Sequence, residues 1–334
     1  MRCESDLPAS AINRDWAPIL LLPVAGVLGF LLTPSTPTWI TLTIAGLAMG
    51  MMIFIVASGL TIVFGLMDVL NFGHGAFITI GGYVAFAVLS ALPGLANSEA
   101  LSDNILALFV ALAVAAISGA LVGLAFERLF VRKVYGDHLK QILVTMGGMI
   151  IIEQIALMIW GPQERLVSLP PMLRGVVPLD EVAIEKYRIL VIAVGSVLFA
   201  SMQLILARTR IGLLVRAGVE DSEMVQALGY RIRRLFIGVF AAGAALAGVG
   251  GVMWVLYRGT LTAGIGGELM TLVFIVIVLG GLGSIGGCFL GAILVAVISN
   301  YAAFVAPSLA LVSTIAVMVA VLLWRPFGLY PLKK

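Results

Sequence analysis

The sequence consists largely of long apolar runs that short polar segments separate. The hydrocarbon core of a bilayer needs about 20 apolar residues per helix, and ten runs come close to this length. They cover residues 17–33, 40–64, 76–92, 104–126, 140–160, 188–206, 234–257, 268–282, 284–305 and 307–324. We therefore expect an all-α, polytopic transmembrane helical bundle. The runs at 17–33, 76–92 and 268–282 are short or interrupted by glycine, so we expect about 8–10 spans, some of them broken or re-entrant.

The low content of charged residues excludes a water-soluble chain. Of the 334 residues, 61% are hydrophobic and 11% are charged, whereas soluble domains carry about 25% charged residues. The polar segments are too short for a soluble domain, so we expect one transmembrane domain over residues 1–334, embedded in lipid. The net charge of +3 gives no reason to expect a nucleic-acid partner. No small-x-small cleavage site follows the first run, which we interpret as a retained span rather than a signal peptide.

The distribution of basic residues between the runs predicts the orientation in the membrane. Lysine and arginine are retained on the cytoplasmic side of spans. Segments 127–140 and 207–234 are rich in both, and the C-terminal tail ends in two lysines. Segment 93–103 has acidic residues but no lysine or arginine, and segment 161–187 has mixed charge, so both are expected outside. We therefore predict a multi-pass protein of the plasma membrane (the bacterial inner membrane) with both termini in the cytoplasm.

The segment at about 207–234 has the pattern of a docking element. Six arginines flank its centre: Arg208, Arg210, Arg216, Arg231, Arg233 and Arg234. Between them, Glu220 and Asp221 suit the first turn of a short helix, where the helix dipole favours negative charge, and Gly229 suits the turn that ends it. Three apolar residues are predicted to share one face of this helix: Met224, Val225 and Leu228. An apolar face at a membrane surface needs a partner, which we expect to be a soluble cytoplasmic protein.

Few ionisable residues lie in or near the runs, and each must face protein or water rather than lipid. Asp68 and His74 bracket Asn71 in GLMDVLNFGHGAF, whose glycines and polar residues predict unwound backbone. This stretch is either part of a solute pathway or gate, or a tightly packed span junction with a satisfied histidine. We interpret Asp68 and Glu153 as intramembrane polar residues. For Glu153, a structural hydrogen-bonded clamp between helices is the alternative to solute contact.

Motifs for catalysis and nucleotide binding are missing from the sequence. No GxxxxGK[ST] segment is present, so the chain has no P-loop with which to bind ATP. Gly281, Gly283 and Gly286 match GxGxxG, but no acidic residue follows at the spacing of a dinucleotide site. These glycines and the GxxxG pair Gly46 and Gly50 instead suit close helix packing and sharp turns. The sequence has no paired carboxylates, nucleophile set or metal cluster, so we expect no enzymatic activity, cofactor or metal.

Five segments of the chain carry further motifs in a fixed order. They are GLTIVFGLMDVLNFGHGAFITIGGYVAF, ERLFVRKVYGDHLKQILVTMGGMIIIEQIALMIWGP, RAGVEDSEMVQALGY, VLGGLGSIGGCFLGAIL and RPFGLY. Together they resemble the LivH-type permease subunits of branched-chain amino acid ABC importers, from about residue 40 to residue 330. Gly73 stands where the NFAHG-like box of that family usually has alanine, and YRGTLTAGIGGEL fits only loosely. These departures leave the solute open rather than the fold.

The resemblance implies a function and a set of partners. A LivH/LivM-type permease carries branched-chain or other hydrophobic amino acids, while similar importers carry urea, short amides or aromatic acids. Two cytoplasmic ATP-binding subunits, a second related permease and an external solute-binding protein complete the importer. The residues predicted to couple to the ATPases are Glu220, Asp221, Ala227 and Gly229, and those predicted for the solute pathway are Asn71 and His74. The rival hypotheses are an ion-coupled secondary transporter and a passive channel.

Overall fold

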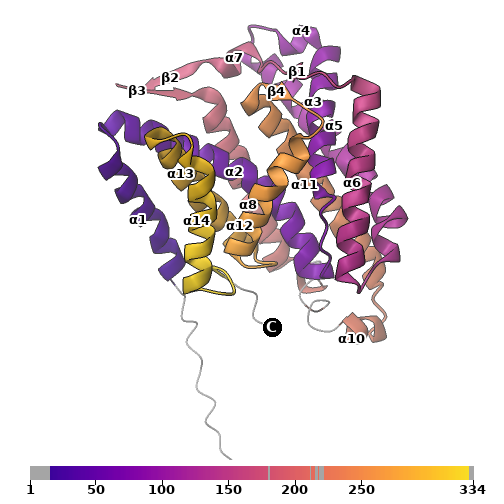
Figure 1. Ribbon diagram of the computed structural model, residues 1–334. Helices are drawn as coiled ribbons and strands as arrows, with labels where there is room; N and C mark the ends of the chain where they lie inside the picture. The colour runs from indigo at the N-terminus through magenta and orange to yellow at the C-terminus, as the bar shows by residue number, and fades with distance from the viewer. Residues whose placement is uncertain (1–15, 180, 211, 215–216, 218–221, 331–334) are drawn as a thin grey trace, which may run out of the picture.

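The apolar runs fold into helices that pack into a bundle and run from one of its faces to the opposite one; we call these the crossing helices. The polar segments between them reverse the chain at these two faces (Figure 1). The computed structural model describes residues 16–179, 181–210, 212–214, 217 and 222–330. The crossing helices are α1 (Ala17–Leu32), α2 (Thr36–Met67), α3 (His74–Ala91), α5 (Leu101–Leu129), α6 (His138–Trp160), α8 (Lys186–Arg208), α11 (Ile232–Arg258), α12 (Ile265–Gly280), α13 (Ile285–Val305) and α14 (Leu309–Trp324). Shorter helices lie in the connections, and those whose bounds fall within the described residues are α4 (Pro93–Ala96), η1 (Val131–Lys133), α7 (Pro171–Arg174) and α10 (Ser222–Ala227).

Each of the ten apolar runs corresponds to one crossing helix, which confirms the predicted all-α, polytopic bundle. Within the described residues, 7 helices are long and apolar enough to cross a membrane: α2, α3, α5, α6, α8, α11 and α13. The helices α1, α12 and α14 are shorter apolar helices. The expectation of a short helix was therefore met for α1 and α12. It was wrong for α3, which extends to 18 residues because it begins at His74, before the apolar run.

The connections alternate between two faces of the bundle, because successive crossing helices run in opposite directions (Figure 1). We call the first the α10 face; its described connections and tail are 68–73, 130–137, 209–210, 212–214, 217, 222–231, 281–284 and 325–330. We call the second the hairpin face; its described connections are 33–35, 92–100, 161–179, 181–185, 259–264 and 306–308. Helix α1 begins and helix α14 ends on the α10 face, as an even number of crossings requires (Figure 1).

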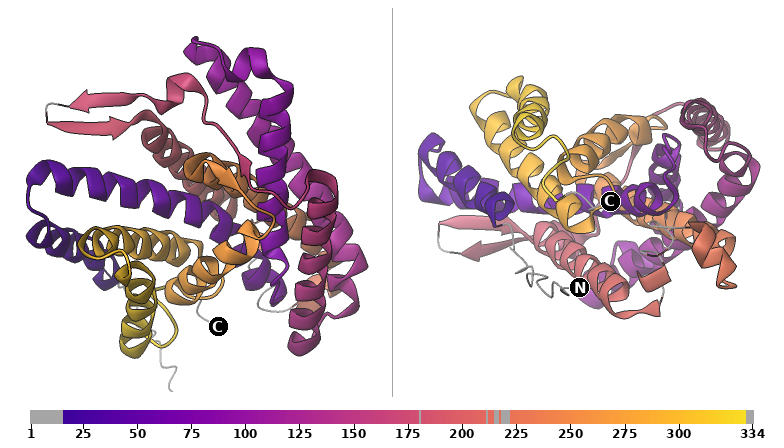
Figure 2. Two further views of the ribbon diagram at one scale, coloured as in Figure 1. Left: turned by 45° about the horizontal axis from the view of Figure 1, so that its top comes forward. Right: turned by 90° about the horizontal axis from the view of Figure 1, so that it is seen from below.

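The described part of the hairpin face contains four short strands that were not expected from the sequence. Strands β2 (Val176–Leu179) and β3 (Val182–Glu185) form an antiparallel hairpin that projects from the bundle (Figure 2). Strand β1 (Arg165–Leu166) pairs with β4 (Thr260–Leu261), which directly follows α11. The Met172 N–H also donates to the Asn104 Oδ1 at 2.9 Å. These bonds fasten the connection between α6 and α8 to the ends of α5 and α11.

Helices α2 and α11 form the centre of the bundle. In the most apolar 18-residue stretch of α2, 78% of the residues are buried, whereas only 17% are buried in the corresponding stretches of α6 and α8. Helices α6 and α8 therefore lie at the periphery. The predicted GxxxG pair, Gly46 and Gly50, lies against α13, since a Cβ on Gly46 would be 2.8 Å from the Val297 Cα. A Cβ on Gly243 of α11 would be 2.7 Å from the Gly59 carbonyl oxygen of α2. The two central helices thus touch backbone to backbone, as small residues allow in lipid.

The turn between α12 and α13 contains the glycines for which a sharp turn was predicted. Gly281 and Gly283 have φ values of +100° and +82°, which side chains with a Cβ rarely adopt. The C-terminal tail packs beside this turn, where the Leu329 N–H donates to the Leu279 carbonyl at 2.9 Å. The tail therefore lies on the same face as α10 (Figure 1).

Candidate functional site

The predicted docking helix is present as α10, and a turn at Gly229 follows its last residue. This glycine has φ +87°, in the left-handed region. Its N–H donates to the Gln226 carbonyl at 2.9 Å, and the Tyr230 N–H donates to the Val225 carbonyl at 3.3 Å. These two bonds form a Schellman motif, which satisfies carbonyls at the helix end. The prediction that Gly229 ends the helix is confirmed.

The apolar residues of α10 do not all share one exposed face, so that prediction was wrong. Met224 is 62% exposed and Leu228 is 71% exposed, whereas Val225 is 5% exposed. Neighbouring residues of a helix differ by about 100° in direction, so Val225 turns into the protein while the other two project from it. Ala227 is exposed as well. Two other residues predicted for this contact lie outside the described residues: Glu220 and Asp221.

The α10 face is more basic than the hairpin face. Its described lysines and arginines are Arg128, Arg132, Lys133, Lys140, Arg208, Arg210, Arg231, Arg233, Arg234 and Arg325, and its described acidic residues are Asp68, Glu127, Asp137 and Glu223. The hairpin face carries Arg165, Arg174, Lys186, Arg188 and Arg258 together with Glu99, Asp103, Glu164, Glu181 and Glu185. By the positive-inside rule, this asymmetry favours a cytoplasmic α10 face.

The stretch between α2 and α3 is unwound, as the sequence predicts. Residues 68–73 have no regular helix, and Asp68 ends α2 with φ +49°, in the left-handed region. The Asp68 side chain is 71% exposed and its Oδ2 lies 3.6 Å from the His138 Nε2 at the start of α6. Asp68 therefore lies exposed at the end of α2 on the α10 face, and its place inside the membrane stays a prediction. No pattern in the sequence had indicated that Asp68 and His138 would lie close together.

Two polar side chains of α6 hold the unwound backbone in place. The Leu70 N–H donates to the Gln141 Oε1 at 3.2 Å, and the Phe72 N–H donates to the Thr145 Oγ1 at 3.1 Å. Gln141 is 1% exposed and Thr145 is 0% exposed. Unwound backbone at membrane depth needs such partners, because lipid offers none. The sequence analysis missed both residues, although two polar residues one helical turn apart at the start of an apolar run would have been a usable signal.

The predicted pathway residues Asn71 and His74 are both 0% exposed. The His74 Nε2 lies 3.1 Å from the Val56 carbonyl oxygen. Within the described part of the chain, the Asn71 side-chain oxygen and nitrogen and the His74 Nδ1 have no hydrogen-bond partner. The junction is thus closed to solvent in this conformation, in line with the packed-junction alternative. Contact of either residue with solute stays a prediction.

Glu153 lies on α6 beside the start of α12 and is partly exposed. A Cβ on Gly267 would be 3.8 Å from its Oε1. No hydrogen bond to it is found among the described residues, so the predicted interhelical clamp is not formed in this conformation. No group of three or more metal-ligating side chains occurs in the described part of the chain.

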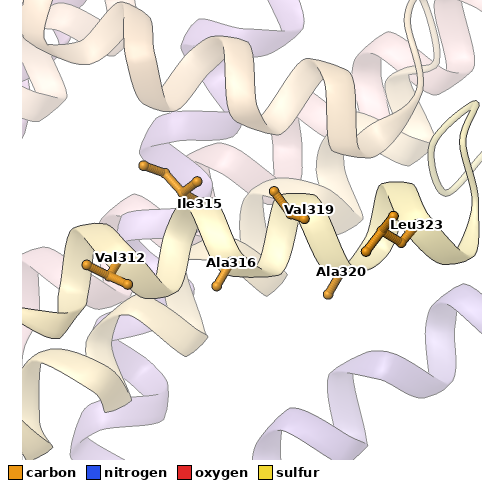
Figure 3. Close-up of a pocket in the computed structure, with 6 residues that line it drawn as sticks. All are labelled: Val312, Ile315, Ala316, Val319, Ala320 and Leu323. Carbon is orange, nitrogen blue, oxygen red and sulfur yellow. The ribbon is translucent and has the colours of Figure 1, made fainter.

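An apolar hollow of about 460 Å³ runs along the outer side of α14 (Figure 3). Its lining residues are Val312, Ile315, Ala316, Val319, Ala320 and Leu323. None of them carries a charge or a hydrogen-bonding side chain, so the hollow has no group to hold the ammonium or carboxylate of an amino acid. It has the chemistry of a lipid-facing surface rather than of a solute site.

Comparison with known proteins gives one consistent result. A family model described as "Branched-chain amino acid transport system / permease component" matches residues 42–322. The high-affinity branched-chain amino acid transport system permease protein BraD of Pseudomonas aeruginosa is 31% identical over 85% of this chain and 93% of its own length. LivH of Escherichia coli K12 is 27% identical over 85% and 92%, and LivM of the same organism is 28% identical over 98% and 78%. No solved structure matches the chain.

Proposed function

The chain belongs to the family of permease components of branched-chain amino acid transport systems, and from this premise we propose how it is powered. The permease is a non-catalytic membrane subunit of an ABC importer. Two cytoplasmic ATP-binding subunits supply the energy, and one docks on α10 of this chain. A second related permease completes the transmembrane conduit, and an external solute-binding protein delivers the solute to the hairpin face.

The exposed tip of α10 is the observation that carries the docking proposal. Leu228 and Tyr230 are 71% and 53% exposed at the end of the helix, next to the three arginines Arg231, Arg233 and Arg234. A large apolar surface exposed beside charged residues marks a protein interaction site. The fixed turn at Gly229 presents this tip in one orientation, which lowers the entropic cost of binding. A cytoplasmic α10 face places it where ATPase subunits can reach it.

In the proposed mechanism, closure of the ATPases on ATP moves α10, and α10 moves the bundle. Because packed helices shift as rigid bodies, the backbone contacts between α2 and α11 make these two helices move together. The unwound residues 68–73 are the natural place for a change of backbone angles. Solute then passes along the interface between the two permeases. The buried Asn71 and His74 would meet solute only if this junction opens.

Co-purification of the ATPases with a charge variant tests the docking proposal. Ala227→Lys places a cation on the exposed docking surface and should abolish ATPase binding while the chain still inserts into the membrane. The matched control is Ser168→Lys, which adds the same charge at an exposed position on the hairpin face. Normal recovery of ATPase subunits with Ala227→Lys would show that the docking surface lies elsewhere.

The proposed solutes are branched-chain or other hydrophobic amino acids, and urea, short amides or aromatic acids are the alternatives. Import of radiolabelled leucine into proteoliposomes holding the complete complex, ATP and the binding protein tests this choice. An ion-coupled transporter would instead keep importing without ATP and stop with an uncoupler. A passive channel would conduct solute in liposomes that hold this chain alone.

A further inference from the structure

A buried carboxylate near the end of α5 has one of its two oxygens unused. Glu127 is 1% exposed. Its Oε1 accepts a hydrogen bond from the Tyr135 hydroxyl at 2.8 Å. Its Oε2 is buried and has no hydrogen-bond partner among the described residues. A buried charged group with an unpaired oxygen is costly, so this atom needs an explanation.

The start of α11 lies next to this pair. The Tyr135 ring is centred 6.5 Å from the ring of Phe236, on the first turns of α11. Partial burial raises the pKa of Tyr135, and its hydrogen bond to Glu127 raises it further, while the charges of Arg233 and Arg132 lower it. Arg233 lies three residues before Phe236 on α11, and Arg132 lies three residues before Tyr135 in its connection, so the fold places both arginines beside this cluster.

The two arginines are attached to different parts of the fold. Arg132 belongs to η1, in the same short connection as Tyr135, so it keeps its place relative to that residue. Arg233 is the second residue of α11, which follows α10 after the Gly229 turn. A displacement of α10 acts on the start of α11, and so on the Arg233 side chain, more directly than on Arg132.

We propose that Glu127 is a positioning residue with two alternative partners, Tyr135 in this conformation and the Arg233 guanidinium when α10 is displaced by the ATPase. The guanidinium binds both carboxylate oxygens: it takes up the unused Oε2 and displaces the Tyr135 hydroxyl from Oε1, and this bidentate pair adds the attraction of opposite charges. The exchange ties the position of α10 to the end of α5, which packs along α11. This inference rests on the proposed docking of an ATPase on α10.

A double-mutant cycle in the complete importer tests the exchange. Glu127→Gln keeps the shape and an acceptor for Tyr135 but cannot form an ion pair, and Arg233→Gln removes the cation. ATP hydrolysed per leucine imported is the measurement. We expect each variant to raise this ratio about tenfold, the effect of losing about 1.4 kcal/mol of coupling. The double variant should be no worse than either single one, because both remove the same interaction.

Arg234→Gln is the matched control, since Arg234 is the exposed neighbour of Arg233 on the same helix. The proposal is overturned if Arg234→Gln raises the ratio as much as Arg233→Gln, if Glu127→Gln leaves it unchanged, or if the effects of Glu127→Gln and Arg233→Gln add independently. Should Glu127→Gln fail to assemble, Tyr135→Phe replaces it: removing the competing partner must lower the ratio, and an unchanged ratio overturns the proposal.

The failure of the proposed function would look different. If ATPases do not co-purify with the unmodified chain, the docking premise is wrong. If the unmodified complex hydrolyses ATP but imports no leucine, leucine is not the solute. The double-mutant cycle of Glu127 and Arg233 then uses the rate of ATP hydrolysis alone as its measurement.

Discussion

Replacing Thr145 by valine should destabilise the junction between α2 and α3. Valine has nearly the same shape but no hydroxyl, so the Phe72 N–H loses the acceptor that now lies 3.1 Å away. Thr145 is 0% exposed, so water cannot readily take its place. Side-chain hydrogen bonds between membrane helices average only about 0.6 kcal/mol when other partners exist. A buried donor left unsatisfied costs about 1–3 kcal/mol, and this is the loss that we expect.

The matched control is Thr314→Val in α14. Thr314 is also buried, at 2% exposure, but its hydroxyl donates at 2.9 Å to the Ala310 carbonyl of its own helix. That carbonyl already accepts a hydrogen bond from a helical N–H, so loss of the Thr314 hydroxyl should change the free energy of unfolding little. Reversible unfolding in mixed detergent and dodecyl sulfate micelles, followed by tryptophan fluorescence, measures both free energies. If Thr145→Val loses no more stability than Thr314→Val, the hydrogen bond from Phe72 to Thr145 does not stabilise the unwound segment.

Three further predictions follow from single positions. Gly46→Val should prevent or strongly weaken folding, because its Cβ would lie 2.8 Å from the α13 backbone, whereas Gly26→Val has open space and should give a normal yield and melting temperature in detergent. Gly229→Ala should cost about 1–2 kcal/mol at φ +87° and weaken ATPase binding in a pull-down titration; unchanged affinity would argue against the turn. The hydrogen bond from Lys140 lowers the pKa of Asp137, the N-cap of α6. The small stabilisation from ionised Asp137 is therefore present at neutral pH and is lost as the pH falls through the lowered pKa. Asp137→Asn should remove this part of the loss of stability in acid, measured by unfolding at a series of pH values.

Much of the fold follows from the length and composition of the apolar runs. A span needs a fixed number of apolar residues, so each run marked one helix, and glycine spacing marked where helices touch. The end of α10 was also predictable, because Gly229 is the residue type that a left-handed turn requires. These features are local in the sequence, which is why a single sequence revealed them.

The features that the sequence did not reveal depend on contacts between distant segments. Gln141 and Thr145 serve the backbone of residues 68–73, which only packing of α6 against α3 brings near. The partnership of Glu127 and Tyr135 likewise depends on how the connection after α5 folds back. The direction of Val225 was mispredicted because a helix as short as α10 is oriented by its surroundings rather than by its own apolar pattern. The orientation of the bundle in the membrane stays a prediction from charge.

Labelling of a cysteine at the tip of α10 tests the docking role of this helix most directly. Ala227→Cys in a chain without Cys3 and Cys288 would carry one exposed thiol. A membrane-impermeant maleimide should label it in inside-out vesicles and leave it unlabelled in right-side-out vesicles, and added ATPase subunits should protect it. Labelling in right-side-out vesicles, or no protection by the ATPases, would contradict the role assigned to this helix.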